Sequence, residues 1–473
     1  MAGLILHLGL FLFGAAVTSA CHTQFIDSGN YSISPDDLDF WLNSGPFSLM
    51  LNGTRRSTDD GSLSVSSYTN PTSGVDDIGQ YTENKWVLSA GNVTMEAAIR
   101  TYPDSTRQVV VFIQRFPQGL SGTRINVNET ITSFPSFLLQ NFSQPLGYLS
   151  YGSFMFGDIN KQAGIWGSNA KINDGLDGSG PLAIFDGLGN AMVVSPLGNF
   201  MASSIWLDKS KASLNFGIMG GVDSLPTNFE HRTIAYCSNT GVGDAFDGWG
   251  GIMRRVYNKT EEVREYHQSQ DLSLTHLGYW TDNGAYYYYN TEQGKNYEDT
   301  LLSAKADWTN RKIPYKYLQI DSWFYPKDST KAVTTWDATE DIFPQGIRAF
   351  EQKIDLPLVA HNRYWSINTT YSKLQGGFFD FVTGDHLSLP NEEFFWQFLI
   401  GHGTLEWGLI VYEQDWLNVQ FLNSEFLIND LYLARTWLKQ MGAAAATHGV
   451  KIQYCMALPR HALQSLEIPT VTQ

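Results

Sequence analysis

The stretch Leu409-Ile410-Val411-Tyr412-Glu413-Gln414-Asp415-Trp416 is an apolar run that ends in a polar and aromatic cluster. Buried strands that alternate with helices are typical of parallel βα units, and segments of helical composition separate this run from similar ones. Polar residues at strand ends are where a (β/α)8 barrel carries its chemistry. Four further runs in the same half of the chain have this form: Leu277–Asp282, Tyr317–Trp323, Pro357–Asn362 and Val450–Cys455.

The N-terminal half has the composition of β-structure instead. Val93–Arg100 alternates apolar and polar residues, a turn follows at Pro103–Ser105, and Gln108–Ile113 resumes the strand pattern, as in a β-hairpin. Glycine-rich turns separate the later apolar runs. We therefore expect three regions: an antiparallel β-sandwich over 22–235, a connector over 236–265 and a barrel segment over 266–473.

Composition narrows the classes of function. The chain has 473 residues, with 31 Lys and Arg against 47 Asp and Glu, and a formal net charge of −16 at pH 7. An acidic surface disfavours nucleic acid and anionic membranes and suits a neutral partner. Aromatic residues make up 14% of the chain, and their flat faces suit the stacking of sugars.

The N-terminus predicts entry into the secretory pathway. Residues 1–20 have an apolar core, Leu4–Val17, followed by the small residues Thr18-Ser19-Ala20, as in a signal peptide. No later stretch is expected to cross a membrane. A secreted or lysosomal glycoprotein is also favoured by seven Asn-X-Ser/Thr sequons, at Asn30, Asn52, Asn92, Asn128, Asn141, Asn258 and Asn368.

Cysteine and histidine residues indicate neither a disulfide framework nor a metal site. Cys21, Cys237 and Cys455 are too few for such a framework, and we expect buried or incidental thiols. The histidines lack metal-ligand spacing, and no phosphate-binding loop, dinucleotide fingerprint or esterase elbow occurs. No metal or cofactor is therefore expected.

The second apolar run and the segment after it resemble a known family. Ile320-Asp321-Ser322-Trp323 is followed by Phe343-Pro344-Gln345-Gly346-Ile347, then by a predicted helix and the third strand. In order and spacing this is similar to the Ile-Asp-Asp-x-Trp and Phe-Pro-x-Gly-Ile/Leu motifs of the melibiase-type α-galactosidases. These enzymes belong to the retaining α-glycosidase clan, which also holds the α-glucosidases. The resemblance covers residues 275–470 and implies a glycoside hydrolase that acts on a carbohydrate substrate.

The resemblance implies that Asp415 is the catalytic nucleophile, because the clan's nucleophilic Asp stands at the end of the fourth barrel strand. Retaining hydrolysis needs an ionised carboxylate there, with a second carboxyl about 5–5.5 Å away. The alternative is that Asp415 only hydrogen-bonds neighbouring loops. Glu413 competes for the role, since a regular strand points both to one face. Melibiases carry a sugar-binding Lys in its place, so Glu413 puts a preference for galactose in doubt.

Substrate contacts are expected from several strand ends. Asp321 matches the first Asp of the family motif, which binds sugar hydroxyls, whereas Ser322 replaces the second. Asp321 could instead cap the next helix. Trp280, Trp323 and Trp416 could each be core aromatic residues, and His361 could make a purely structural hydrogen bond. The other substrate-binding candidates are Trp280, Trp323, His361, Asn362, Arg363, Glu413, Trp416 and Arg460.

The barrel segment is shorter than a closed barrel, which typically has about 250 residues. We identify five strands, with Ile468–Gln473 as the start of a sixth, and we expect an incomplete (β/α)8 barrel in a fragment or truncated form of a longer enzyme. The later carboxylates, Glu425, Asp430 and Glu467, do not match the acid/base position of the clan. The competing interpretations are a catalytically inactive carbohydrate-binding protein and, last, a purely structural β-sandwich protein. The sequence does not indicate an oligomeric state.

Overall fold

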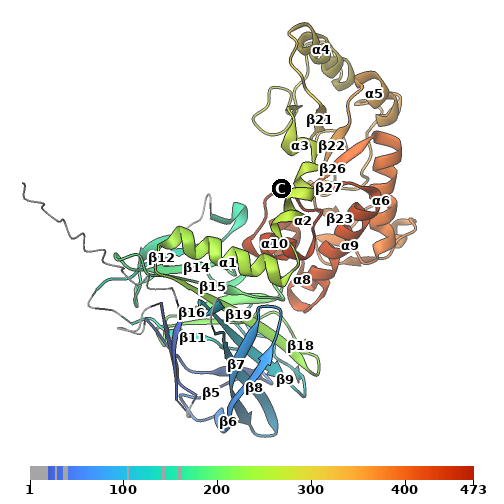
Figure 1. Cartoon of the computed structure of the whole chain (residues 1–473). Helices are drawn as coiled ribbons and strands as arrows, with labels where there is room; N and C mark the ends of the chain where they lie inside the picture. The colour runs from blue at the N-terminus through green and yellow to red at the C-terminus, as the bar shows by residue number, and fades with distance from the viewer. Residues whose placement is uncertain are drawn as a thin grey trace, which may run out of the picture.

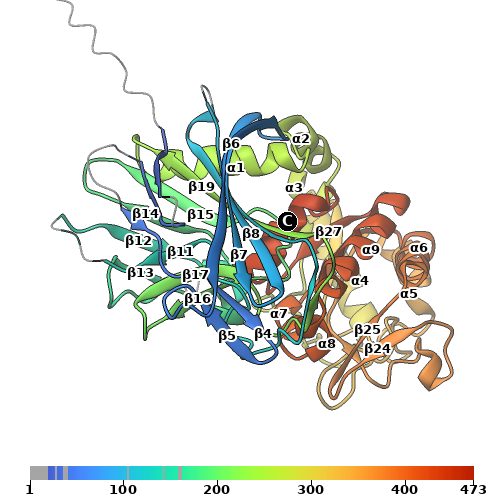
Figure 2. The ribbon, with the colours of Figure 1, turned by 90° about the horizontal axis from the view of Figure 1, so that it is seen from below.

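The computed structural model describes residues 20–26, 29–35, 41–103, 106–140, 142, 144–157 and 162–473. The predicted signal peptide lies outside these residues, apart from its last position. The N-terminal half consists of antiparallel sheets, and the C-terminal half is built around a parallel sheet (Figures 1 and 2). In the described residues, no helix has both the length and the apolar character that a membrane span requires.

A nine-stranded antiparallel sheet forms the centre of the N-terminal half. One of its inner strands, β9 (Val109–Phe116), is buried along almost its whole length, because the sheet is covered on both faces and the strand is nearly all apolar. At one edge, β6 carries Pro71 at a bulge, where a missing backbone donor costs little. In spatial order the strands are β13 (Gln162–Ile165), β12 (Gly147–Ser150), β14 (Leu182–Phe185), β15 (Ala191–Pro196), β19 (Phe229–Ser238), β9 (Val109–Phe116), β8 (Val93–Thr101), β7 (Gln80–Ala90) and β6 (Ser64–Val75).

Smaller antiparallel sheets pack against this one and share its core. Phe112 of β9 and Phe137 of β11 meet with their ring centroids 5.8 Å apart, and both belong to one continuous apolar cluster. This half therefore has the strand-rich, antiparallel character expected from the sequence. Its remaining elements are β1 (His22–Phe25), β2 (Tyr31–Ser34), β3 (Leu42–Asn43), β4 (Ser48–Leu51), β5 (Thr54–Ser57), β10 (Leu120–Ser121), β11 (Ser136–Leu138), β16 (Ser203–Asp208), β17 (Ser213–Ile218), β18 (Ser224–Leu225), η2 (Phe154–Gly157) and η3 (Gly175–Asp177).

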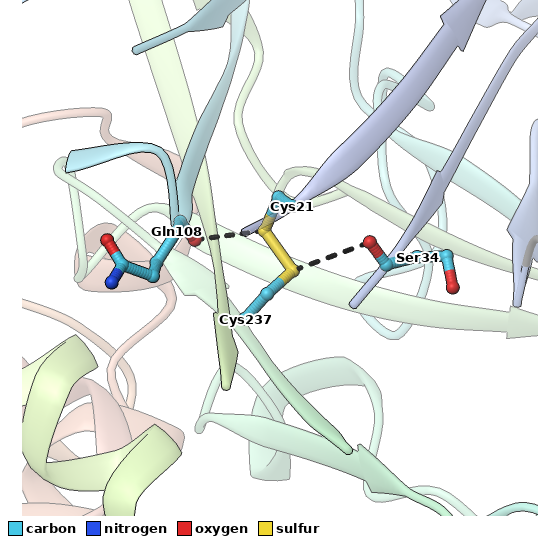
Figure 3. Close-up of a disulfide and its surroundings, with 4 residues drawn as sticks. All are labelled: Cys21, Ser34, Gln108 and Cys237. Carbon is cyan, nitrogen blue, oxygen red and sulfur yellow. Dashed lines mark hydrogen bonds between the residues drawn. A yellow bond between two sulfur atoms is a disulfide. The ribbon is translucent and has the colours of Figure 1, made fainter. Parts of the chain in front are cut away.

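A disulfide joins Cys21 to Cys237, which corrects the expectation of free thiols (Figure 3). The two residues are 216 positions apart, and Cys237 lies on β19. The bridge thus fastens the chain that precedes β1 to the nine-stranded sheet. The Cys21 sulfur lies 2.9 Å from the carbonyl oxygen of Gln108, and Cys455 is free.

Three helices connect the two halves: α1 (Val242–Val256), α2 (Glu261–Ser269) and α3 (Leu272–Thr275). α1 packs on β15 and β19. Its close approach depends on Gly248, because a Cβ at this position would lie 2.2 Å from the ring of Tyr236.

The five apolar runs form one parallel sheet in chain order. The strands are β20 (Gly278–Tyr279), β21 (Tyr317–Ile320), β22 (Leu358–Asn362), β26 (Leu409–Gln414) and β27 (Lys451–Tyr454), and each pairs in parallel with the next. The end of the chain runs beside β27, where the Ile452 amide donates to the Thr470 carbonyl at 2.9 Å.

The main helices of this half pack on one face of the parallel sheet (Figure 1). Alternate strand residues, such as Leu318, Ala360 and Tyr412, point into the core with these helices. The residues between them point to the other face, where Tyr317, Val359 and Val411 form a small apolar cluster and the residues toward the strand ends are polar. The elements are α4 (Tyr297–Asn310), α5 (Gly346–Ile354), α6 (Glu393–Trp407), α7 (Leu417–Leu422), α8 (Glu425–Asn429), α9 (Leu433–His448), α10 (Pro459–Gln464), η4 (Lys373–Gln375), η5 (Ser465–Glu467) and a small sheet of β23 (Trp365–Ser366), β25 (Leu387–Pro390) and β24 (Phe381–Thr383).

Candidate active site

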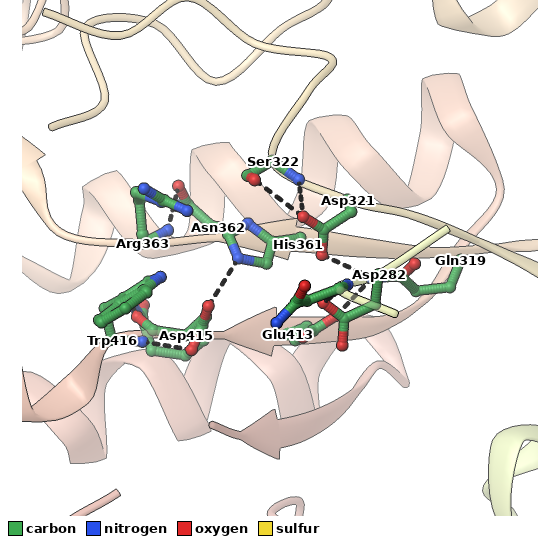
Figure 4. A network of polar contacts seen from close by, with 12 residues as sticks. Asp282, Gln319, Asp321, Ser322, His361, Asn362, Arg363, Glu413, Asp415 and Trp416 are labelled. Carbon is green, nitrogen blue, oxygen red and sulfur yellow. Dashed lines mark hydrogen bonds and ion pairs between the residues drawn. The ribbon is translucent and has the colours of Figure 1, made fainter. Parts of the chain in front are cut away.

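Polar side chains from three neighbouring strands gather on the face of the parallel sheet opposite its main helices (Figure 4). Gln319 and Asp321 come from the end of β21, His361 from β22, and Glu413 and Asp415 from the end of β26. His361 is in register with Glu413. All five residues are buried, so their contacts with one another decide which of them are charged.

Asp415 is held as a carboxylate by three donors. His361 Nε2 lies 2.9 Å from its Oδ2, the backbone amide of Trp416 donates to its Oδ1 at 2.6 Å, and the thiol of Cys455 also contacts it. Burial alone would raise the pKa of Asp415, but these donors outweigh it and leave the pKa below its ordinary value. The ionised form is therefore the stable one.

His361 is oriented by its two ring nitrogens. The Tyr325 hydroxyl lies 2.7 Å from Nδ1, so a neutral His361 accepts from Tyr325 and donates through Nε2 to Asp415. Burial lowers the pKa of His361, but the negative charge of Asp321 and the hydrogen bond and charge of Asp415 raise it more, and its net shift is upward. His361 therefore keeps a proton more readily than an ordinary histidine, and its Nε2 faces the carboxylate of Asp415.

Asp282, Asp321 and Glu413 form what we call the acidic cluster. The Gln319 amide nitrogen donates to Asp321 at 3.1 Å and to Glu413 at 2.9 Å. Burial raises the pKa of Glu413 to about 8, with a contribution from Asp321. Burial also raises the pKa of Asp282, again with a contribution from the charge of Asp321. Glu413 is therefore mostly protonated at neutral pH, and the cluster does not carry its full formal charge.

A metal centre fits these residues poorly. Asp321, His361 and Glu413 each offer one ligand atom, and these atoms lie within 4.8 Å of one another. Both nitrogens of His361 are already engaged, one by Tyr325 and one by Asp415. A metal would have to displace one of these partners, so the arrangement favours a hydrogen-bonded network.

Arg363 and Trp416 lie on the other side of Asp415 from the acidic cluster (Figure 4). The Arg363 guanidinium carbon is 5.7 Å from the centroid of the Trp416 ring. Trp416 has a φ of 55°, which is unusual for a bulky residue and is a feature that clusters at functional sites. This backbone turn lets the Trp416 amide point back at the Asp415 carboxylate.

The other predicted site residues have different surroundings. The Asn362 amide donates to the Tyr412 hydroxyl at 2.6 Å and belongs to the core face of the sheet. Trp323 stacks on Tyr297 with ring centroids 3.8 Å apart. Trp280 donates to the Tyr317 hydroxyl at 3.0 Å and is partly buried.

Arg460 lies apart from this group, against the N-terminal half. Its side chain is fully buried and donates to the backbone carbonyls of Met201, Ser203 and Leu176. Burial lowers the pKa of Arg460 to about 10. These contacts join α10 to the antiparallel sheets.

The structure adds Asp282, Gln319, Tyr325, Lys327 and Cys455 to the residues that the sequence singled out. Alternation along the strands could have indicated Gln319, which precedes Asp321 by two positions and shares its face. Tyr325 and Lys327 lie on the segment between β21 and α5, where no periodic pattern operates.

Comparison with known proteins gives the fold a context. No protein-family model and no curated protein sequence matches the chain. The ligand-free α-N-acetylgalactosaminidase NagBb from Bifidobacterium bifidum matches with a TM-score of 0.57 at 11% identity, over 96% of this chain and 78% of that one.

Two α-galactosidases give similar matches. The GH36 α-galactosidase AgaA from Geobacillus stearothermophilus has a TM-score of 0.57 at 10% identity, over 94% of this chain and 73% of that one. The α-galactosidase from Lactobacillus brevis has a TM-score of 0.54 at 12% identity, over 95% and 70%. At these identities the likeness concerns the fold, and the chain has an α-glycosidase-type fold.

Proposed function

We propose that this chain is a glycoside hydrolase of the retaining α-glycosidase type with Asp415 as its nucleophile. The observation that carries the proposal is an ionised carboxylate at the end of a parallel strand, held by His361 and by the Trp416 amide. The likeness in fold to α-galactosidases supports the same class of reaction. On this proposal, the five-stranded sheet is part of a (β/α)8 barrel that follows a β-sandwich domain, and its chemistry lies at the strand ends.

The proposed reaction has two steps. Asp415 attacks the anomeric carbon while the glycosidic bond breaks, which gives a glycosyl ester, and water then hydrolyses this ester with overall retention. The first step requires a proton for the leaving oxygen, and we assign that role to none of the described residues. The ionised state of Asp415 is what the attack requires, and its three donors supply it.

The acidic cluster would bind the sugar. Asp321 and Asp282 can accept hydrogen bonds from hydroxyl groups, and the carboxyl of Glu413, which is mostly protonated at neutral pH, can both donate and accept. Trp416, which is partly exposed, offers a flat face for stacking. This combination of groups suits a polyhydroxylated ring.

We also propose that the protein follows the secretory route as an N-glycoprotein. Six of the seven sequon asparagines lie in the described residues, and all six are exposed, as oligosaccharide attachment requires: Asn30, Asn52, Asn92, Asn128, Asn258 and Asn368. The Cys21–Cys237 disulfide fits an oxidising compartment.

The test of the nucleophile is covalent labelling. A fluorinated glycoside with an activated leaving group needs little protonation, so Asp415 alone can form the ester. We expect mass spectrometry to find one added glycosyl group on the peptide that contains Asp415. Asp415→Asn should abolish this label.

Asp385→Asn is the matched control, because Asp385 is exposed on the turn between β24 and β25 and should not change labelling. A label that survives Asp415→Asn would reject Asp415 as the nucleophile. Binding of glycosides without any label would favour the alternative, an inactive carbohydrate-binding protein.

A further inference from the structure

Two cations border the candidate site without a carboxylate partner. Arg363 is only 8% exposed, yet its Nε has no hydrogen-bond partner. Lys327 Nζ is bonded to backbone carbonyls, those of Ser322 and Tyr325. Within the described part of the chain, neither side chain forms an ion pair with a carboxylate. A buried charge without a counter-charge is costly, so both groups are suited to an external anion.

The two cations belong to one locality. Lys327 Nζ lies 4.5 Å from the centroid of the Tyr325 ring, and Tyr325 in turn bonds His361 beside Asp415. Burial lowers the pKa of Lys327 to about 8, and the positive charge of Arg363 contributes to this shift. The charge of Asp415 likewise acts on Arg363. Both cations therefore lie near the proposed nucleophile.

The site is polarised as a result. Figure 4 shows Asp282, Asp321 and Glu413 on one side of Asp415, with Arg363 and Trp416 on the other. Hydroxyl groups of a sugar can satisfy the acidic side. Sugar hydroxyl groups would leave the N–H groups of the Arg363 guanidinium without an anionic partner. A guanidinium pairs best with a planar or tetrahedral oxyanion that accepts two hydrogen bonds.

We propose that Arg363 and Lys327 form a subsite for an anionic substituent of the sugar, a carboxylate or a sulfate ester. This inference rests on the proposed function and names the substrate class of the same site. The guanidinium of Arg363 makes the paired contact, and the ammonium of Lys327 adds charge from the Tyr325 side. The Trp416 ring lies beside the guanidinium, 5.7 Å from its carbon.

The test is isothermal titration calorimetry with the whole chain. Methyl α-D-galactoside and methyl α-D-glucoside are compared with their uronic acids and with their 2-O- and 6-O-sulfates. We expect at least one anionic form to bind about tenfold or more tightly than its neutral parent, because charge-assisted hydrogen bonds are the stronger ones. The carboxylate and sulfate arms identify the anion. The preference should weaken with added salt.

Variants tie this preference to the two residues. Arg363→Gln should reduce the anionic-to-neutral affinity ratio to about one, Arg363→Lys should keep part of it, and Lys327→Gln should lower it less. Arg348→Gln is the control, since Arg348 is exposed and paired with Glu406, and it should leave the ratio unchanged. Circular dichroism checks that each variant is folded. If Arg363→Gln does not fold, the affinity ratios of Arg363→Lys and Lys327→Gln test the subsite in its place.

The outcomes separate this inference from the proposed function. Equal affinity for neutral and anionic glycosides, or a ratio that survives Arg363→Gln, overturns the anionic subsite and leaves the glycosidase proposal standing. If no glycoside binds in any form, both fail.

Discussion

Both halves of the molecule bury charged side chains, but they pair them differently. In the N-terminal half, Glu83 accepts hydrogen bonds from Arg100 at 2.8 Å and from both terminal nitrogens of Arg115 at 2.8 and 2.9 Å. These cations outweigh the effect of burial and leave the pKa of Glu83 below its ordinary value. In the C-terminal half, the acidic cluster gathers carboxyl groups, and Arg363 lies on the other side of Asp415 from it. Among the described residues, neither Arg363 nor Lys327 forms an ion pair with a carboxylate.

The difference separates charges that serve the fold from charges that serve a site. A buried ion costs free energy unless an opposite charge and hydrogen bonds offset that cost. The Glu83 network offsets it internally. In the C-terminal half, the pKa values of Glu413 and Asp282 are raised, and Arg363 and Lys327 have no carboxylate partner among the described residues. Such perturbed groups are typical of sites that bind a ligand.

The largest expected effect is on the N-terminal network. Glu83→Gln removes the buried negative charge that two partly buried arginines share, and it should lower the free energy of unfolding by about 3 kcal/mol. Urea denaturation followed by circular dichroism measures this change. The control is Glu230→Gln, because Glu230 also pairs with Arg115, at 3.0 Å, but its side chain is 39% exposed. That variant should cost about 1 kcal/mol or less, and equal losses would contradict the comparison.

In the acidic cluster, the corresponding substitution Glu413→Gln should raise the free energy of unfolding toward pH 8 instead of lowering it. The pKa of Glu413 is raised from 4.5 to about 8, so between these values the folded chain keeps a proton that the unfolded chain has released. Wild-type stability should therefore fall as pH rises through this window, by at most about 1.4 kcal/mol per pH unit from this group.

Glu413→Gln resembles the protonated carboxyl in shape and cannot titrate. The variant should match wild type near pH 5 and become the more stable of the two toward pH 8, as measured by thermal unfolding at each pH. If the stability difference between the two proteins does not change with pH, Glu413 is not protonated in the folded state.

A third effect concerns the nucleophile. His361 is the main reason that the pKa of Asp415 is low despite burial, so His361→Ala should raise that pKa. The rate of labelling with the fluorinated glycoside should fall at low pH as Asp415 becomes protonated, and this acidic limb of the pH profile should move to higher pH in the variant. Tyr325→Phe removes only the contact to Nδ1 and should move the limb less. An unchanged limb in His361→Ala would separate His361 from the ionisation of Asp415.

The sequence predicted the strands of the C-terminal half because each is a short apolar run with a polar end. Leu409–Gln414 forms β26, and Asp415 follows it directly, as the pattern indicated. Asn362 shows the limit of this reasoning. It adjoins His361 in sequence, but successive strand residues point to opposite faces, and its amide meets Tyr412.

Other features carry no local signal. Cys21 and Cys237 are 216 positions apart, and no spacing rule connects them. β9 pairs with β19 in the middle of the nine-stranded sheet, a contact set by packing of distant segments. Tyr325 and Lys327 lie on an irregular segment, so the contact of Tyr325 with His361 depends on the tertiary fold.

The smallest expected effect isolates the third donor to Asp415. Burial and the nearby charge of Asp415 raise the pKa of the Cys455 thiol, so it remains an S–H group and can donate weakly to the carboxylate. Cys455→Ala should shift the acidic limb of labelling upward by less than His361→Ala does, and Cys455→Ser, which keeps a donor, should shift it little or not at all. The measurement is the pH dependence of the labelling rate in all three variants side by side. A Cys455→Ala shift as large as that of His361→Ala would mean that the thiol, and not the imidazole, keeps Asp415 ionised.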